Sequence, residues 1–265
     1  RHYVSQGGTV VALGAVGTTD DLGRGRSEFE LSEVLGVSRV GESPFSVSYL
    51  DALDARLSPG LPPMPLLVKA APPHETLGRR RSLRCRAHPG AEVWARFTDP
   101  AFEPDVDAGR HIYHMHCPPA RRTEWPAVVR RTLGAGQTFY VAAPVAYAFG
   151  YSGSPWLRRF FANLLGAAGR PQRLRVEGPP GLEVALMEQA GVWRLHLVPR
   201  HTETLGSAQR AEALWVHGVR VSVRRPGLRR VTLHPDGNAL PFKRSGDAVL
   251  FDLPPFRDWR IVSIE

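Results

Sequence analysis

The stretch LGAVG (13–17) is the first place in the sequence with the shape of a catalytic bend. It follows a short apolar run, TVVAL (9–13), and in an α/β protein the loop at the carboxyl end of such a strand is where ligands and reactive groups gather. A nucleophile there needs a thiol or hydroxyl activated by a base. The residues between the two glycines are an alanine and a valine, which carry only hydrocarbon. Thr18 and Thr19 follow without a base, so we interpret them as turn residues and predict no nucleophile at this bend.

A second stretch, RHIYHMHCPP (110–119), gathers imidazoles and a thiol, the side chains that zinc prefers. Its candidate ligands are His111, His114, His116 and Cys117. If the stretch is a strand, His114 and His116 share one side and the other two point away. Partners such as His74 or His88 would have to come from elsewhere, and no spacing specifies them. We interpret the stretch as a polar loop leading into two prolines, with a metal-dependent hydrolase built on His111–Cys117 as an alternative.

Acidic residues form a third group, because glycoside hydrolysis needs two carboxyl groups. The group consists of Asp20, Asp21, Asp99, Glu103, Asp105 and Asp107. Turn-forming residues lie close to them, so we predict solvated turns rather than a catalytic pair. Exposed aromatic rings could stack on sugars, and the candidates are Trp94, Trp125 and Trp215, although tryptophans in strands more often belong to the core. We therefore assign no catalytic, cofactor-binding or metal-binding residue and expect no cofactor.

Composition narrows the class of partner. The chain has 265 residues, of which 43% are hydrophobic and 22% charged, as in globular proteins of one or two domains. Its net charge of +9 is almost all arginine, since Lys69 and Lys243 are its lysines, and it is spread along the chain. An even spread argues against a phosphate-binding face, so we predict no nucleic-acid partner. No apolar run reaches the ~18 residues that cross a bilayer, so we predict no membrane partner, with the cytoplasm slightly favoured as location.

The chain has two cysteines, Cys85 and Cys117. Two are too few for a disulfide framework or a closed zinc site. We favour two free thiols, with a single bridge between them as the alternative.

Local patterns predict mixed α/β structure up to about residue 170. Residues 1–6 read as the end of a helix that Gly7 terminates, which indicates that the chain starts inside a domain. The run 9–13 reads as a buried parallel strand, and 136–145 as another strand ending in a loop. Residues 81–87 and 91–97 alternate around a Pro-Gly pair, which predicts a β-hairpin.

Two further helices are expected. For residues 27–37, Ser27 and Glu30 form a capping box, Leu31, Val34 and Leu35 share a face, and Gly36 ends the helix. For residues 154–169, Ser154 is the N-cap and Pro155 suits the first turn. Two apolar stripes run along this second helix, so we expect it to pack on a sheet. The stripes are Trp156, Phe160 and Leu164, and Leu157, Phe161 and Leu165.

After Pro171 the sequence changes to short alternating strands. Residues 193–197, 219–224 and 230–234 each alternate apolar and polar side chains, and glycine-containing turns separate them. No helix of ordinary length fits between them, so residues 171–265 are predicted to form an all-β sandwich. The segment 202–218 is a long insertion in which we expect a partner surface.

Residues 1–168 resemble one family of domains. The carrying segments are HYVSQGGTVVALGAVGTTDDLGR (2–24), FELSEVLGV (29–37), ESPFSVSYL (42–50) and the run from Trp125 to Leu165. They are similar to the glutamine-amidotransferase-like domain called the β-galactosidase trimerisation domain, in which a helix ending in YV..GG leads into a strand and a short DLLGV-type helix. The family's GKG.V.Y...P strand is matched from Gly134 to Pro144, with Ala135 where a lysine is common. The tail, residues 216–265, is similar to the C-terminal β-domain of the same glycoside hydrolases.

The resemblance implies an N-terminally incomplete, partly flavodoxin-like or amidotransferase-like sheet with flanking helices in residues 1–170, followed by the sandwich in 171–265. Class I amidotransferases place a cysteine in a G-x-C-x-G bend, and LGAVG lacks it. The expected function is therefore the non-catalytic C-terminal region of a glycoside hydrolase in carbohydrate metabolism. Its implied partners are its own catalytic (β/α)₈ barrel, of which nothing is recognisable here, and further copies of itself, with a trimer as one form. A carbohydrate-binding module is an alternative.

Overall fold

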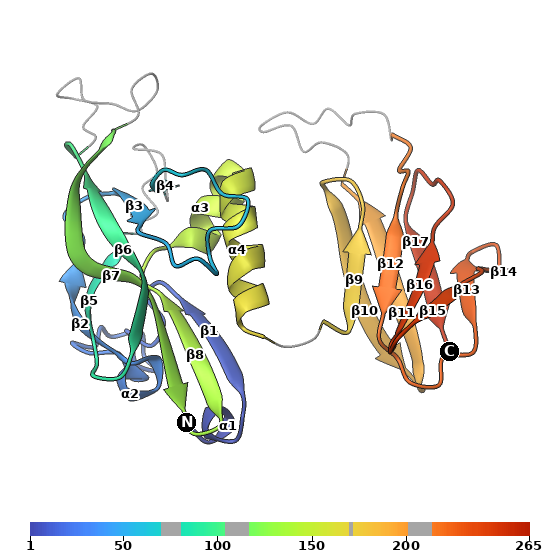
Figure 1. Cartoon of the computed structure of the whole chain (residues 1–265), viewed down its shortest axis with the longest axis horizontal. Coiled ribbons are helices and arrows are strands. Elements are labelled where there is room, and N and C mark those ends of the chain that lie inside the picture. The colour runs from blue at the N-terminus through green and yellow to red at the C-terminus, as the bar shows by residue number, and fades with distance from the viewer. Residues whose placement is uncertain (70–80, 104–116, 170–171, 201–213) are drawn as a thin grey trace. The chain divides into compact units, whose positions relative to one another are not determined.

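The computed structural model describes residues 1–69, 81–103, 117–169, 172–200 and 214–265. The chain divides into two compact units, Arg1–Arg170 and Pro171–Glu265, and each has its own hydrophobic core (Figure 1). Most of the regular structure is β-strand. Within the described ranges no helix is both long enough and apolar enough to cross a bilayer.

A six-stranded sheet forms the centre of the N-terminal unit. Its order is β1 (Thr9–Leu13), β8 (Gly136–Val141), β7 (Pro119–Leu133), β6 (Glu92–Pro100), β3 (Val47–Asp51) and β4 (Leu66–Lys69). Strands β1 and β8 pair in parallel, as predicted for residues 9–13, and the other neighbours in this sheet are antiparallel. β1 is an edge strand in which Ala12 alone is buried, so the expectation of a fully buried strand is wrong. As an edge strand, β1 has a neighbouring strand, β8, along one of its edges only, which explains why most of its residues are partly exposed.

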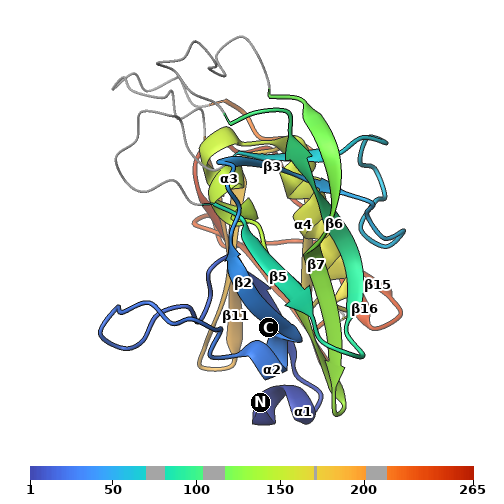
Figure 2. The ribbon, with the colours of Figure 1, turned by 90° about the vertical axis from the view of Figure 1, so that its left-hand side faces the viewer.

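The predicted hairpin between residues 81 and 97 does not form. Both strands exist, as β5 (Leu83–Ala87) and β6, but β5 pairs with β2 (Val37–Glu42) in a separate two-stranded sheet, which Figure 2 shows face-on. The turn at Pro89-Gly90 is present, but the strand before it and the strand after it belong to different sheets. Backbone bonds around this point explain the choice, because the His88 N–H donates to the Gly36 carbonyl at 2.9 Å and continues the β2 pairing.

The N-terminal helices are short. They are α1 (His2–Ser5), α2 (Ser32–Leu35), α3 (Val145–Ser152) and α4 (Pro155–Ala167). The expected helix over 27–37 is reduced to α2, whose N-cap is Leu31 rather than Ser27, and Leu31 is exposed. Gly36 ends α2 with φ +72°, in the left-handed region that glycine adopts without strain.

Helix α4 follows its sequence signals closely. The Ser154 hydroxyl accepts the Leu157 N–H at 3.4 Å, and Pro155 occupies the first turn. The helix buries a single stripe, Leu157, Phe160 and Leu164, instead of the two predicted stripes. Trp156 and Leu165, which belong to the predicted stripes, are exposed. One narrow stripe suffices because the helix covers a single face of the core.

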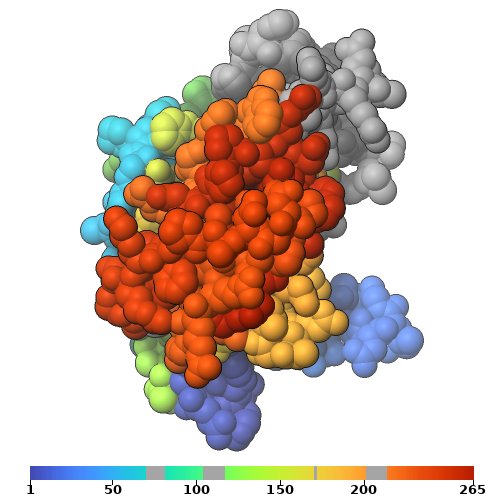
Figure 3. Space-filling view, turned by 90° about the vertical axis from the view of Figure 1, so that its right-hand side faces the viewer, coloured from blue at the N-terminus to red at the C-terminus, as the bar shows by residue number. Residues whose placement is uncertain are grey.

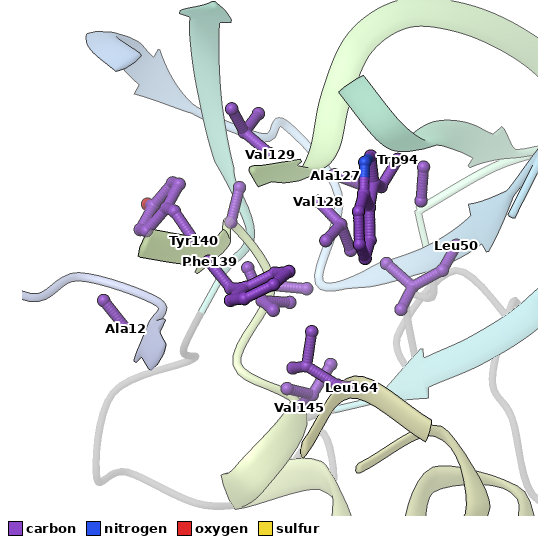
Figure 4. Close-up of a cluster of buried hydrophobic side chains, with 14 of the residues drawn as sticks. Ala12, Leu50, Trp94, Ala127, Val128, Val129, Phe139, Tyr140, Val145 and Leu164 are labelled. Carbon is purple, nitrogen blue, oxygen red and sulfur yellow. The ribbon is translucent and has the colours of Figure 1, made fainter. Parts of the chain in front are cut away.

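The core of the N-terminal unit combines residues of the six-stranded sheet with residues of α3 and α4 and of α2, β2 and β5. Phe139 and Trp94 meet edge to face, with ring centroids 5.2 Å apart, and Leu164 of α4 reaches the same cluster (Figure 4). Gly136 is buried at the start of β8, where an added Cβ would overlap the carbonyl oxygens of Val4 and Gly8. The close approach of α1 to β8 therefore depends on the missing side chain.

The C-terminal unit consists of two antiparallel sheets around one core. The five-stranded sheet has the order β10 (Leu182–Gln189), β11 (Val192–Pro199), β17 (Arg260–Ile264), β13 (Val231–His234) and β14 (Asn238–Ala239). The four-stranded sheet has the order β15 (Lys243–Ser245), β16 (Ala248–Asp252), β12 (Arg220–Val223) and β9 (Leu174–Glu177). The predicted apolar positions are confirmed, because Leu195, Leu197, Val221, Val223 and Val231 are all buried. The alternation itself fails in β13, where the intervening Thr232 is buried as well. Figure 3 shows the surface of this unit in yellow, orange and red.

Candidate functional site

The bend after β1 holds its shape with backbone and turn contacts. The Gly14 N–H donates to the Val141 carbonyl at 2.8 Å, which ties the bend to the end of β8. The Thr18 hydroxyl donates to the Ala15 carbonyl at 2.7 Å, so it closes the turn and is occupied there. Thr19 forms an isolated antiparallel bridge with Gly25. Thr18 is a turn residue, as predicted, whereas Thr19 belongs to a β-bridge.

Asp20 organises the loop beyond the bend. Its carboxylate accepts the N–H groups of Leu22 and Arg24 at 2.9 Å each, and the Arg24 Nε at 2.7 Å. These bonds, first the one from the Arg24 N–H, lower the pKa of Asp20. Asp20 and the exposed Asp21 are therefore turn residues, and a carboxylate with a lowered pKa is unsuited to donate a proton to a leaving group.

A thiol does lie near this bend, but it is not activated. Cys85 of β5 is fully buried, and burial raises its pKa to about 12, although a hydrogen bond with Tyr140 opposes the rise. The Tyr140 hydroxyl also donates to the Gly14 carbonyl at 2.9 Å. Since the thiolate is the nucleophilic form, a protonated, enclosed Cys85 cannot act as an amidotransferase cysteine.

Both cysteines are free, as predicted. Cys117 is buried, and its Sγ donates to the Phe102 carbonyl at 2.6 Å. Burial raises its pKa, so this thiol is also a poor metal ligand in this state. His111, His114 and His116, together with His74, lie outside the described residues.

His88, the other imidazole considered for a metal site, is engaged elsewhere. Arg131 can only donate, so its Nη1, 3.2 Å away, requires Nδ1 of His88 to accept. Nε2 lies 2.8 Å from the Ser38 hydroxyl. Within the ranges that the structure describes, no three His, Cys, Asp or Glu side chains gather as a metal site would require.

Asp99 contradicts the prediction of a solvated turn. It lies in β6 with its side chain 3% exposed, and it pairs with the equally enclosed Arg84 of β5 and, at 3.0 Å, with Arg121 of β7. Arg84 Nη1 is buried without a hydrogen-bond partner. The prediction failed because both arginines come from other strands, so nothing next to Asp99 in the sequence signals its burial.

The remaining acidic residues also lack the arrangement of a catalytic pair. Burial alone would raise the pKa of Asp51, but hydrogen bonds from Ala52 and Thr98 and the charge of Arg122 outweigh it and lower that pKa. Glu103 accepts the Ser46 N–H at 2.7 Å. Asp105 and Asp107 lie outside the described residues. A lowered pKa makes Asp51 unsuited to the role of a glycosidase acid, which needs a raised one.

The three tryptophans considered for sugar stacking divide into core and surface. Trp94 is buried and donates to Glu92 at 3.1 Å, and Trp125 packs against the core, so neither offers a free ring face. Trp215 is 59% exposed. Sequence reasoning missed Trp156 and Trp259, which are also exposed.

Sequence reasoning also missed a surface cavity of about 510 Å³ on the four-stranded sheet of the C-terminal unit. Its lining combines apolar side chains with an Arg220–Asp252 ion pair at 2.8 Å. The one available signal was Pro241, which cannot donate to a strand ladder and marks the end of an edge strand.

Solved structures with a similar fold include several glycoside hydrolases. The chain is similar to α-L-fucosidase isoenzyme 2 from Paenibacillus thiaminolyticus, with a TM-score of 0.73 and 23% identity over 97% of this chain and 36% of that one. It is also similar to the β-galactosidase of Bacillus circulans sp. alkalophilus, with a TM-score of 0.54 and 18% identity over 100% of this chain and 30% of that one. The cold-adapted β-galactosidase of Rahnella sp. R3 gives 0.54 and 16% over 99% and 29%.

These identities establish a shared fold and no more. The chain spans roughly a third of the length of the neighbouring structures, from 29% to 36%. No family model and no curated protein sequence matches the chain.

Proposed function

We propose that this chain is the non-catalytic C-terminal region of a glycoside hydrolase, and that it serves assembly. In this proposal the N-terminal unit descends from an amidotransferase-like α/β domain, and the C-terminal unit is the accompanying β-sandwich. The observation that carries it is the bend after β1, where Ala15 and Val16 replace any nucleophile, Thr18 closes the turn and Cys85 stays protonated. A domain that has lost its catalytic nucleophile can still serve through its surfaces, by binding other domains or other copies of the protein.

The share of the neighbours that the chain covers supports the same proposal. Nearly all of this chain matches about a third of each glycoside hydrolase, which leaves the greater part of those enzymes for the catalytic machinery. We propose a catalytic barrel as the first partner of this chain and a second copy of the protein as the next, with a trimer as the expected form.

The loop between β1 and α2 is the surface we assign to assembly. It projects from the N-terminal unit (Figure 2), and Asp20 and the Thr19–Gly25 bridge hold it in one shape. Its apolar Leu22 is 77% exposed. An ordered loop that presents a large apolar side chain to water loses little entropy on docking, which favours a contact.

Light scattering on the intact protein at micromolar concentrations tests this role. We expect an oligomer, and we expect Leu22→Asp to shift it toward the monomer. Met64→Asp is the matched control, because Met64 is 63% exposed on a different loop and should leave the assembly unchanged. A monomer at all concentrations, or equal dissociation by both variants, would refute the assembly role.

Activity assays on the 265-residue chain test the non-catalytic part. Neither nitrophenyl glycosides nor glutamine should be turned over. Turnover that is abolished by changing a residue of this chain would contradict the proposal.

A carbohydrate-binding module is the second candidate, and the cavity beside Asp252 is the observation that favours it. The metal-dependent hydrolase built on residues 111–117 stays a prediction, and metal analysis of the purified protein with less than about a tenth of an equivalent of zinc would exclude it.

A further inference from the structure

The cavity on the four-stranded sheet has the size and lining of a small-ligand site. At about 510 Å³ it falls within the range of pockets that hold small molecules. Seven residues line it, all from the C-terminal unit: Arg220, Pro241, Phe242, Lys243, Leu250, Phe251 and Asp252.

The cavity exists because an edge strand stops early. Pairing of β15 with β16 ends at Lys243 opposite Leu250. The next residues toward the N-terminus, Phe242 and Pro241, would face Phe251 and Asp252, but they belong to no strand. Proline cannot donate a ladder hydrogen bond, so the chain leaves the sheet there and the cavity lies beside the last residues of β16.

One wall of the cavity is apolar. Val249 and Phe251 point into the core, so the strand alternation turns Leu250 and Asp252 outward. Phe242 packs partly against the same core, and the Arg244 guanidinium lies 5.9 Å from its ring centroid. These contacts hold the ring in place, so Pro241, Phe242 and Leu250 form a fixed apolar surface at the edge of the sheet.

The other wall is a paired carboxylate and guanidinium. Arg220 and Asp252 are directly opposite each other on β12 and β16, with Nε and Oδ1 2.8 Å apart. The pKa of Asp252 is lowered, first by its hydrogen bond from Arg220 and also by Lys243, so the group is an ionised acceptor at neutral pH. Because Asp252 already neutralises Arg220, the wall offers donors and acceptors side by side rather than a site for a phosphate.

We propose that this cavity binds one pyranose unit of a glycan. A pyranose has an apolar ring face, which suits Phe242 and Leu250, and adjacent hydroxyls that both donate and accept, which suit Asp252 with Arg220 and Lys243. The choice of sugar as ligand class rests on the proposed function, whereas the existence of a ligand site rests on the cavity alone.

Chemical-shift titration of the 265-residue chain tests the site. The probes are methyl β-galactoside and methyl α-L-fucoside, with sorbitol as a polyol that lacks a ring. We expect a dissociation constant on the order of 1 mM for at least one glycoside, with shifts confined to the amides of 220–222, 242–243 and 250–252. The absence of shifts with both glycosides, shifts located elsewhere, or equal binding of sorbitol would overturn the proposal.

Two variants and a matched control sharpen the test. Asp252→Asn should weaken binding by about tenfold, since it removes a hydrogen bond to a charged group. Phe242→Ala should weaken it by about as much, since it removes the apolar surface against which the sugar ring packs. Asp247→Asn is the control. Asp247 lies in the turn between β15 and β16 and pairs with Arg224 at 3.2 Å, but it does not line the cavity. Equal weakening by Asp247→Asn would contradict the assignment. Asp252 is exposed, so its variant should fold normally even if Phe242→Ala does not.

This result and the light-scattering result are independent. A protein that assembles but binds no glycoside loses the sugar site and keeps the assembly role. A monomer that binds glycosides loses the assembly role and keeps the site.

Discussion

The two units each contain an aspartate–arginine pair that joins two strands, but in opposite surroundings: Arg84 and Asp99 come from different sheets, whereas Arg220 and Asp252 face each other in one sheet. In the N-terminal unit the side chains of Arg84 and Asp99 are 6% and 3% exposed. In the C-terminal unit those of Arg220 and Asp252 are 60% and 67% exposed. In the first pair both charges are shielded from water, so each depends on the other for stabilisation. In the second pair both charges remain hydrated, and each can exchange its partner for water or another group. The same kind of ion pair is therefore a structural element in the N-terminal unit, whereas in the C-terminal unit it is accessible from solvent.

Asp99→Asn should give the largest effect. Removing this charge leaves Arg84 buried with no counter-ion, which costs about 3–5 kcal/mol. Urea unfolding followed by a signal from the N-terminal unit should show that loss in the free energy of unfolding. A loss below about 1 kcal/mol would mean that water reaches Arg84 and compensates its charge once the carboxylate is gone.

The double variant Arg84→Met with Asp99→Leu should recover at least half of that loss. Replacing both members of a buried pair by apolar side chains removes the uncompensated charge together with its cause. The same urea titration measures the recovery. If the double variant is as unstable as Asp99→Asn, the pair matters for shape rather than for charge balance.

Acid should weaken the N-terminal unit through Asp51 by a smaller amount. The folded pKa of Asp51 lies below its unfolded value of about 3.9, so the group stabilises the fold above that value and the contribution is lost as pH falls through the folded pKa. Asp51→Asn should flatten the stability curve in this acid range. An unchanged slope would show that the hydrogen bonds from Ala52 and Thr98 and the charge of Arg122 do not lower this pKa in solution.

Asp252→Asn should change stability least. Its pair is fully hydrated, so the melting temperature should stay at the wild-type value, with or without 1 M NaCl. Thermal unfolding measures this, and a clear destabilisation would contradict the contrast between the two pairs.

Sequence signals predicted the features that depend on residues close together in the chain. Ser154, Pro155 and the stripe along α4 mark one helix within a dozen residues, and the Ala-Val pair in LGAVG excludes a nucleophile by residue type alone. Strand pairing is a non-local choice, so the segments 81–87 and 91–97 are correctly predicted as strands but wrongly paired with each other.

The candidate sites were hidden for the same reason. Asp99 meets arginines from two other strands, and the cavity draws on residues from 220 to 252 that become neighbours only after folding. Sequence alone gives the side chains but not which of them share a water-free environment, and burial decides whether a charge is structural or reactive.

The absent side chain at Gly136 has a consequence for how this protein tolerates change. Ala135, next to it, is exposed. At position 136 even a methyl group would meet two backbone carbonyl oxygens, which cannot rotate out of the way. A saturation scan should therefore give adjacent positions of opposite character, one open to almost any amino acid and one closed to all but the smallest.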